Sequence, residues 1–123
     1  MTAQIIDGKI VASAIKESLK PRIAALKEKG IVPGLAAVLV GDDPASATYV
    51  GSKAKACEEL GMYSEVIRQP KELMPEALES IIHGLNANKR IHGILVQSPL
   101  PKHFDEEAMT LLIDPSKDVD GFH

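Results

Sequence analysis

A tyrosine and a lysine one helical turn apart are the residues whose types and spacing could carry out chemistry. Tyr49 and Lys53 lie in a stretch that reads as a helix, with Asp43 as its cap and Gly61 as its end. Four positions apart, their side chains share one face of the helix. With Tyr49 at 0°, Lys53 falls at about 40°, inside the apolar arc. That arc is predicted to consist of Tyr49, Leu60, Cys57 and Val50.

A lysine in an apolar arc has two interpretations. Lys53 can lay its stem on apolar surface and send its ammonium to water at the flank of the helix, which is the commoner case for a lone lysine. Alternatively, it lines a cleft where it is partly withdrawn from water, so that its neutral amine can exchange protons near neutral pH. Tyr49 would then stack on a substrate or join a proton relay. The helix alone leaves both interpretations open.

Strands and helices alternate along the chain in an order that predicts a parallel sheet. Leu35–Val40 and Ile91–Gln97 are aliphatic runs typical of strands buried on both faces, whereas Tyr63–Arg68 is more polar and is expected nearer an edge. Strands separated by helices of this length are typical of βαβ units. The predicted fold class is therefore α/β, a three-layer domain with a mostly parallel sheet flanked by helices. The predicted helices are 9–29, with a kink or break at Pro21, 44–60, 75–86 and 104–113.

Two loops are predicted to meet at the carboxyl ends of these strands, where open α/β sheets bind ligands. Gly41–Asp43 follows the first buried strand, and Gln97–Pro101 follows the third. Gln97 and the prolines after it could form a fixed cleft wall, or they could merely satisfy loop backbone and end the strand. Lys53, near the middle of its helix, can reach this edge only if the helix tilts toward the cleft.

Composition indicates a globular protein and disfavours several functional classes. The 123 residues are 45% hydrophobic and 25% charged, the balance of one globular domain. A net charge of −3 gives no excess of positive charge that would favour binding to nucleic acid or to an anionic membrane. The single cysteine excludes an internal disulfide and suits a reducing compartment. With no signal-like start and no apolar run of membrane-spanning length, we expect a soluble cytoplasmic protein.

Several other residues carry weaker signals. Cys57 falls in the apolar arc, so buried packing is favoured over nucleophilic chemistry. Asp105–Glu107 suits the first turn of a helix, where the macrodipole favours negative charge, better than a paired-carboxylate site. No metal site is predicted, because the histidines have no ligand spacing with one another or with Cys57. These histidines are His83, His92, His103 and His123.

Three segments, in the right order, resemble known signatures. They are Tyr49–Lys53 with the preceding Val40–Ser46, then Gly93–Pro101, and then Lys117–His123. They resemble the signatures of methylenetetrahydrofolate dehydrogenase/methenyltetrahydrofolate cyclohydrolase, the bifunctional folate enzyme family, and Ile6–Lys9 resembles that family's start. The resemblance implies that residues 1–123 are a tetrahydrofolate dehydrogenase/cyclohydrolase catalytic, folate-binding domain.

The resemblance also implies an activity and the residues that perform it. The family interconverts 5,10-methylene-, 5,10-methenyl- and 10-formyl-tetrahydrofolate by a nicotinamide-dependent dehydrogenation and a cyclohydrolase step. Lys53 matches the lysine that transfers protons when water adds to the methenyl carbon. Tyr49 matches the tyrosine that shapes the folate site, and Gln97 the glutamine that contacts and orients the lysine. The implied folate contacts further include Pro99, Leu100 and Asp120, which matches the pterin-binding aspartate better than its neighbour Asp118.

Two departures from the family pattern qualify these expectations. Ser98 stands where a leucine is common, and is expected to loosen one wall of the folate pocket. No G-x-G-x-x-G follows a strand, so NADP (or NAD) is expected to be bound by a C-terminal Rossmann domain that this chain lacks. We therefore expect an N-terminal catalytic domain without dehydrogenase activity and with at most weak cyclohydrolase activity. The resemblance implies a homodimer for the full-length enzyme; alternatives for the fragment are a non-catalytic folate- or pterin-binding module and a purely structural α/β domain.

Overall fold

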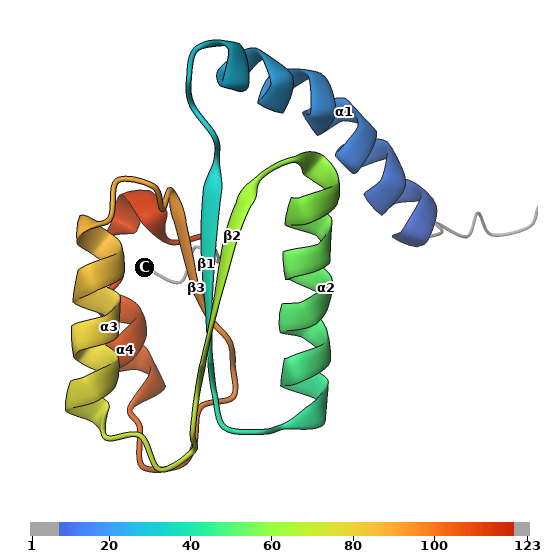
Figure 1. Cartoon of the computed structure of the whole chain (residues 1–123). Helices are drawn as coiled ribbons and strands as arrows, with labels where there is room; N and C mark the ends of the chain where they lie inside the picture. The colour runs from blue at the N-terminus through green and yellow to red at the C-terminus, as the bar shows by residue number, and fades with distance from the viewer. Residues whose placement is uncertain (1–7, 120–123) are drawn as a thin grey trace, which may run out of the picture.

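A three-stranded parallel sheet forms the centre of the protein. The structure is a computed structural model that describes residues 8–119, with side chains described from residue 14. The strands are β1 (Gly34–Val40), β2 (Tyr63–Gln69) and β3 (Gly93–Val96), in the order β2-β1-β3. Helix α2 (Pro44–Leu60) covers one face, and α3 (Pro75–Ala87) and α4 (Glu106–Leu111) cover the other (Figure 1). The predicted three-layer α/β class is confirmed.

The central position of β1 follows from its composition. Its aliphatic residues are buried along almost the whole strand, because neighbours pair on both sides and helices lie on both faces. The register with β2 runs from Gly34 opposite Tyr63 to Val40 opposite Gln69. The more polar β2 is only partly buried and lies at an edge, as predicted.

The side chains of β1 alternate between two cores of different size, as the period of a strand requires. Ala36, Val38 and Val40 face the larger core, beneath α3 and α4. Ala37 and Leu39 face α2 in a smaller cluster. The second half of the chain contributes most of the larger core: Leu78, Ile82, Leu85, Ile91, Ile94, Leu100, Phe104, Met109 and Ile113.

Helix α2 has the ends that its sequence predicts. The Asp43 side chain accepts the Ser46 N–H, Pro44 occupies the first turn, and Gly61 closes the helix at a φ of 77°. A positive φ is strained for residues with a β-carbon, so glycine suits this position.

The predicted apolar arc of α2 is wrong at Tyr49, whose residue surface is 58% exposed. The buried residues of α2 are Ser46, Val50 and Cys57, which cluster between about 60° and 100° on the helical wheel. Contact with the sheet covers only this narrow arc, so Tyr49 at 0° projects past its edge. Lys53, at about 40°, lies at the margin of the buried arc and is partly buried.

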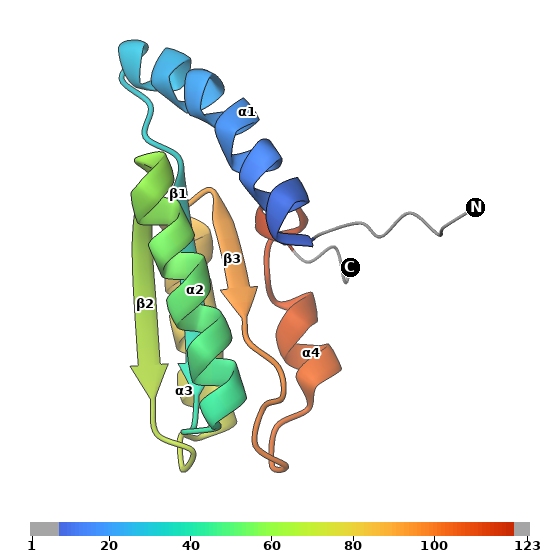
Figure 2. The ribbon, with the colours of Figure 1, turned by 90° about the vertical axis from the view of Figure 1, so that its right-hand side faces the viewer.

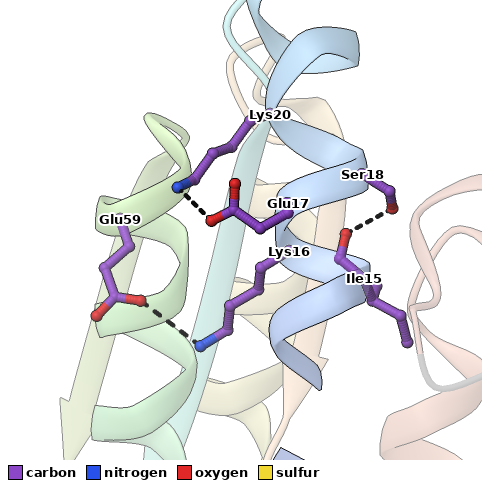
Figure 3. Close-up of polar contacts among 6 residues, drawn as sticks. All are labelled: Ile15, Lys16, Glu17, Ser18, Lys20 and Glu59. Atoms are coloured by element: carbon purple, nitrogen blue, oxygen red, sulfur yellow. Dashed lines mark hydrogen bonds and ion pairs between the residues drawn. The ribbon is translucent and has the colours of Figure 1, made fainter. Parts of the chain in front are cut away.

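Helix α1 (Gly8–Glu28) continues across Pro21, so the predicted break there is wrong. Pro21 is exposed, and a helix can lack a single N–H donor without ending when the remaining hydrogen bonds persist. α1 contacts α2, where Lys16 Nζ lies 3.5 Å from a carboxylate oxygen of Glu59 (Figure 3). Within α1, Lys20 pairs with Glu17 at 2.7 Å. Both ion pairs are exposed, so each contributes little to stability.

Two predicted elements are shorter in the structure. α4 begins at Glu106 instead of 104, because Asp105 is its cap and accepts the Ala108 N–H at 3.1 Å. The predicted strand 91–97 is reduced to β3, whose pairing with β1 stops at Val96. The chain then turns through a cis peptide bond between Ser98 and Pro99. Within residues 8–119, no helix has both the length and the apolar character needed to cross a membrane.

Candidate functional site

Lys53 and Gln97, 44 positions apart, meet in the folded chain. Lys53 Nζ donates a hydrogen bond to Gln97 Oε1 at 2.9 Å. α2 carries the lysine, and the glutamine follows directly after β3, where its backbone N–H bonds the Val38 carbonyl at 2.9 Å. The partial burial of Lys53 and its contact with Gln97 favour the cleft interpretation over a lysine that merely reaches solvent.

A cavity of about 400 Å³ opens beside Lys53. α2 packs over β1 and β2, while β3 lies at its side (Figure 2). The strand residues that line the cavity come from the amino end of β1 and from β3, and the lining includes no residue of the loops 41–43 and 97–101. The prediction of a ligand site at the carboxyl edge is therefore wrong for this cavity. Apart from Lys53 and His92, its lining is apolar or glycine. The lining consists of Pro33, Gly34, Leu35, Lys53, Met62, His92, Gly93, Leu95 and Val119.

The Gln97–Leu100 loop is held from the α4 side by one carboxylate. Ser98 Oγ donates to Glu106 Oε2 at 3.0 Å, and the Leu100 N–H donates to Glu106 Oε1. Ser98 is not among the residues that line the Lys53 cavity. Its hydroxyl instead ties the loop to α4, a hydrogen bond that a leucine could not make.

Lys117 anchors the segment that brings Val119 to the cavity. It ends the 3-10 helix η1 (Pro115–Lys117), and its Nζ donates to the carbonyls of Asn86 at 2.8 Å and Asn88 at 3.1 Å. A lysine at this position satisfies carbonyls that the end of α3 leaves unpaired. Asp118 then forms a parallel bridge with Ile94 of β3. The segment is therefore fixed alongside β3.

Comparison with known families shows to which family the chain belongs. The tetrahydrofolate dehydrogenase/cyclohydrolase catalytic domain matches residues 6–120. The chain belongs to this family. It is 54% identical to the bifunctional protein FolD of Nitratiruptor sp. over 121 residues, which are 98% of this chain and 43% of that protein. The chain thus spans less than half the length of this relative.

Solved structures of the family share the fold. The bifunctional enzyme FolD from Campylobacter jejuni matches with a TM-score of 0.92 and 50% identity, over 95% of this chain and 42% of that one. The FolD of Trypanosoma brucei, crystallised with NADP and an inhibitor, matches with a TM-score of 0.93 and 39% identity, over 98% and 41%.

The other site residues implied by the family resemblance lie in different surroundings. Tyr49 is exposed one turn before Lys53, and Pro99 is exposed on the loop. Leu100 is 9% exposed and packs in the larger core. Asp120 lies outside the described residues, although Val119 before it lines the cavity. The roles of these residues stay predictions.

Sequence reasoning missed two residues that shape the cavity. His92 Nδ1 accepts the Gly34 N–H at 3.0 Å, which fixes the ring at the cavity wall. The backbone of Gly93 lies close to Val119, because a β-carbon at Gly93 would lie 2.5 Å from Val119 Cγ1 and would require that side chain to shift. A glycine at the start of a buried strand is a signal of close approach that could have indicated this contact.

We expect the stability of the folded chain to fall at acid pH when the Asp43 carboxylate is protonated. The hydroxyl and the backbone N–H of Ser46 lower the pKa of Asp43 from its ordinary value of 3.8. Its stabilising contribution is thus complete above 3.8 and is lost as pH falls through the lower folded-state value. Urea unfolding of wild type and Asp43→Asn, from neutral to strongly acid pH, measures this. Asparagine caps helices about as well, so the wild type should lose more stability in acid; parallel curves would contradict this.

Cys57 is expected to be unreactive in the native protein. It is 5% exposed, as its predicted packing role requires, and burial raises the pKa of its thiol. Because the thiolate is the reactive form, a thiol reagent at neutral pH should modify the native chain at least about tenfold more slowly than the urea-unfolded chain. The rate of absorbance change with Ellman's reagent measures this, and equal rates would show that Cys57 is accessible.

Proposed function

We propose that this chain supplies the folate site and the catalytic lysine of an enzyme that interconverts 5,10-methylene-, 5,10-methenyl- and 10-formyl-tetrahydrofolate. The observation that carries the proposal is that Lys53, which lines a mainly apolar cavity, donates a hydrogen bond from Nζ to Gln97 Oε1 at 2.9 Å. Family membership over residues 6–120 supports the substrate class. Lys53 is the proposed acid/base, and Gln97 and Tyr49 are its partners.

The geometry suits proton transfer in the cyclohydrolase step. As water attacks the methenyl carbon, a C–O bond forms and the Lys53 amine accepts a proton from the water. When the intermediate collapses to the formyl group, its hydroxyl releases a proton to water as the C=O bond forms, a C–N bond of the ring breaks, and the departing nitrogen takes up the proton held by Lys53. Gln97 Oε1 holds the amine in place for both transfers. The apolar walls would cover the flat face of a pterin ring and limit the access of bulk water.

Pterin and aminobenzoyl contacts complete the proposed site. Tyr49 presents an exposed ring one turn from Lys53, available to stack on an aromatic part of the substrate. Asp120, next to the cavity-lining Val119, is the proposed pterin ligand, and Pro99 and Leu100 are proposed to shape the folate pocket. The homodimer implied for the full-length enzyme stays a prediction.

The dehydrogenase step needs a nicotinamide cofactor, and the T. brucei relative was crystallised with NADP. The turn from β1 into α2 does not suit the phosphates of this cofactor. The turn from β1 into α2 carries Asp42 and Asp43, and the Asp43 carboxylate already caps the helix where a phosphate would otherwise bind. We therefore assign no hydride-transfer step to these residues. We propose that NADP (or NAD) binds within the length of the relatives that this chain does not span.

The first experiment follows the absorbance decay of 5,10-methenyltetrahydrofolate with the purified chain and no nicotinamide, after subtraction of the buffer-catalysed rate. Acceleration that scales with chain concentration is the expected result. A rate equal to background, together with saturable folate binding, would overturn cyclohydrolase activity of this chain and support the non-catalytic folate-binding alternative. Absence of both would support a structural domain.

A further inference from the structure

Ser46 is buried far more deeply than an N-terminal helix residue needs to be. It lies in the first turn of α2 and is 2% exposed, the one polar side chain among the described residues that is buried to this degree. Burial of a hydroxyl is unfavourable unless its hydrogen bonds are satisfied. Its partners therefore indicate what the hydroxyl does.

The Ser46 hydroxyl bridges the helix cap and the loop after β3. Ser46 Oγ lies 2.8 Å from Asp43 Oδ2 and 3.2 Å from the Ser98 carbonyl oxygen. Both partners only accept, so the single hydroxyl hydrogen is shared between them. The Ser98 carbonyl also accepts Gln97 Nε2 at 3.2 Å. One carbonyl thus joins Ser46 to the side chain that contacts Lys53.

The partners of the Gln97 amide define its orientation. The acceptor-only Ser98 carbonyl lies beside the amide nitrogen, and Lys53 Nζ donates to the amide oxygen. A flipped amide would place its oxygen against the Ser98 carbonyl and its NH2 group against the lysine, which loses both hydrogen bonds. The position of the Ser98 carbonyl therefore favours the amide orientation in which Gln97 presents its oxygen to Lys53.

We propose that Ser46 is a positioning residue for the Lys53–Gln97 pair. By holding the Ser98 carbonyl from the α2 side, it keeps Gln97 Oε1 turned toward Lys53. Glu106 holds the same loop from the α4 side, through Ser98 Oγ and the Leu100 N–H. The link to catalysis rests on the proposed function, whereas the positioning itself does not.

NMR of the Gln97 side-chain amide tests the positioning without turnover. In Ser46→Ala, its hydrogens should exchange with water at least about threefold faster than in wild type, because their acceptor is less firmly held. Ser46→Cys, with its weaker donor, should give a smaller increase. Thr48→Ala is the matched control: the Thr48 hydroxyl lies on the same helix and donates only to the Pro44 carbonyl at 2.9 Å. Unchanged exchange in a folded Ser46→Ala chain would overturn the proposal.

A double-mutant cycle on methenyltetrahydrofolate hydrolysis then separates positioning from general destabilisation. Ser46→Ala should lower kcat about tenfold with KM nearly unchanged, and should have no further effect in a Gln97→Ala background. Losses that multiply would show that Ser46 acts independently of Gln97 and overturn the proposal. If the wild-type chain has no turnover, the cyclohydrolase proposal fails, and the amide exchange alone decides the role of Ser46.

Discussion

Lys53→Gln is expected to lower the rate of methenyltetrahydrofolate hydrolysis by at least about 100-fold, the lower range for loss of a general acid/base. Glutamine has no amine to accept the proton from water, and a shorter, uncharged amide replaces the amine that donates to Gln97 Oε1 at 2.9 Å. Substrate binding should be largely kept, because most of the cavity lining is apolar and unchanged. The measurement is absorbance decay at saturating substrate, with binding followed separately by fluorescence or calorimetry.

Lys55→Gln is the matched control for this prediction. Lys55 lies on the same helix and is exposed, and it makes the same change of charge without touching the cavity. Its hydrolysis rate should equal the wild-type rate. If Lys53→Gln and Lys55→Gln retain equal activity, Lys53 is not the acid/base. If Lys53→Gln abolishes binding together with turnover, the lysine holds the substrate and does not act only on its chemistry.

Gly34→Ala is expected to have the largest effect on stability. A β-carbon at Gly34 would lie 2.0 Å from the backbone carbonyl oxygen of Arg90. Backbone cannot move aside as a flexible side chain can, so the first residue of β1 must separate from the segment before β3. A backbone hydrogen bond also joins Gly34 to that segment: the Gly34 carbonyl accepts the His92 N–H at 2.8 Å. Overpacking of this kind costs about 3 kcal/mol.

Thermal unfolding by circular dichroism measures the Gly34 prediction, and a melting temperature lowered by roughly 10 °C or more is expected. Gly84→Ala is the control. Gly84 lies within α3, one turn before its end, is exposed, and has nothing within 4 Å of an added β-carbon. Alanine there should stabilise the chain by about 0.5–1 kcal/mol, because it restricts the unfolded chain and favours the helix. A Gly34→Ala melting temperature equal to wild type would show that the close approach is not tight.

Local patterns predicted the elements well where the signal was strong. The aliphatic run of β1 and the capped ends of α2 were confirmed within a residue. The shorter elements were less predictable, because the cap at Asp105 and the pairing limit at Val96 depend on contacts outside the local pattern. The predicted break at Pro21 was wrong, since a proline on an exposed face removes only one hydrogen bond from a long helix; the alternative of a kink there stays a prediction.

The sequence by itself determined the three-layer α/β fold, through residue types and their spacing. Its resemblance to known signatures indicated the family and the candidate pair of Lys53 and Gln97. Only the tertiary structure decided that the two side chains meet at 2.9 Å. It also decided that the cavity runs along β3 toward His92, and that Tyr49 projects from the helix. The physical reason is that helical periodicity defines angles about one axis. The packing of α2 against the sheet decides how much of its apolar arc is buried. The packing of the loops decides which distant carbonyl the buried Ser46 hydroxyl reaches.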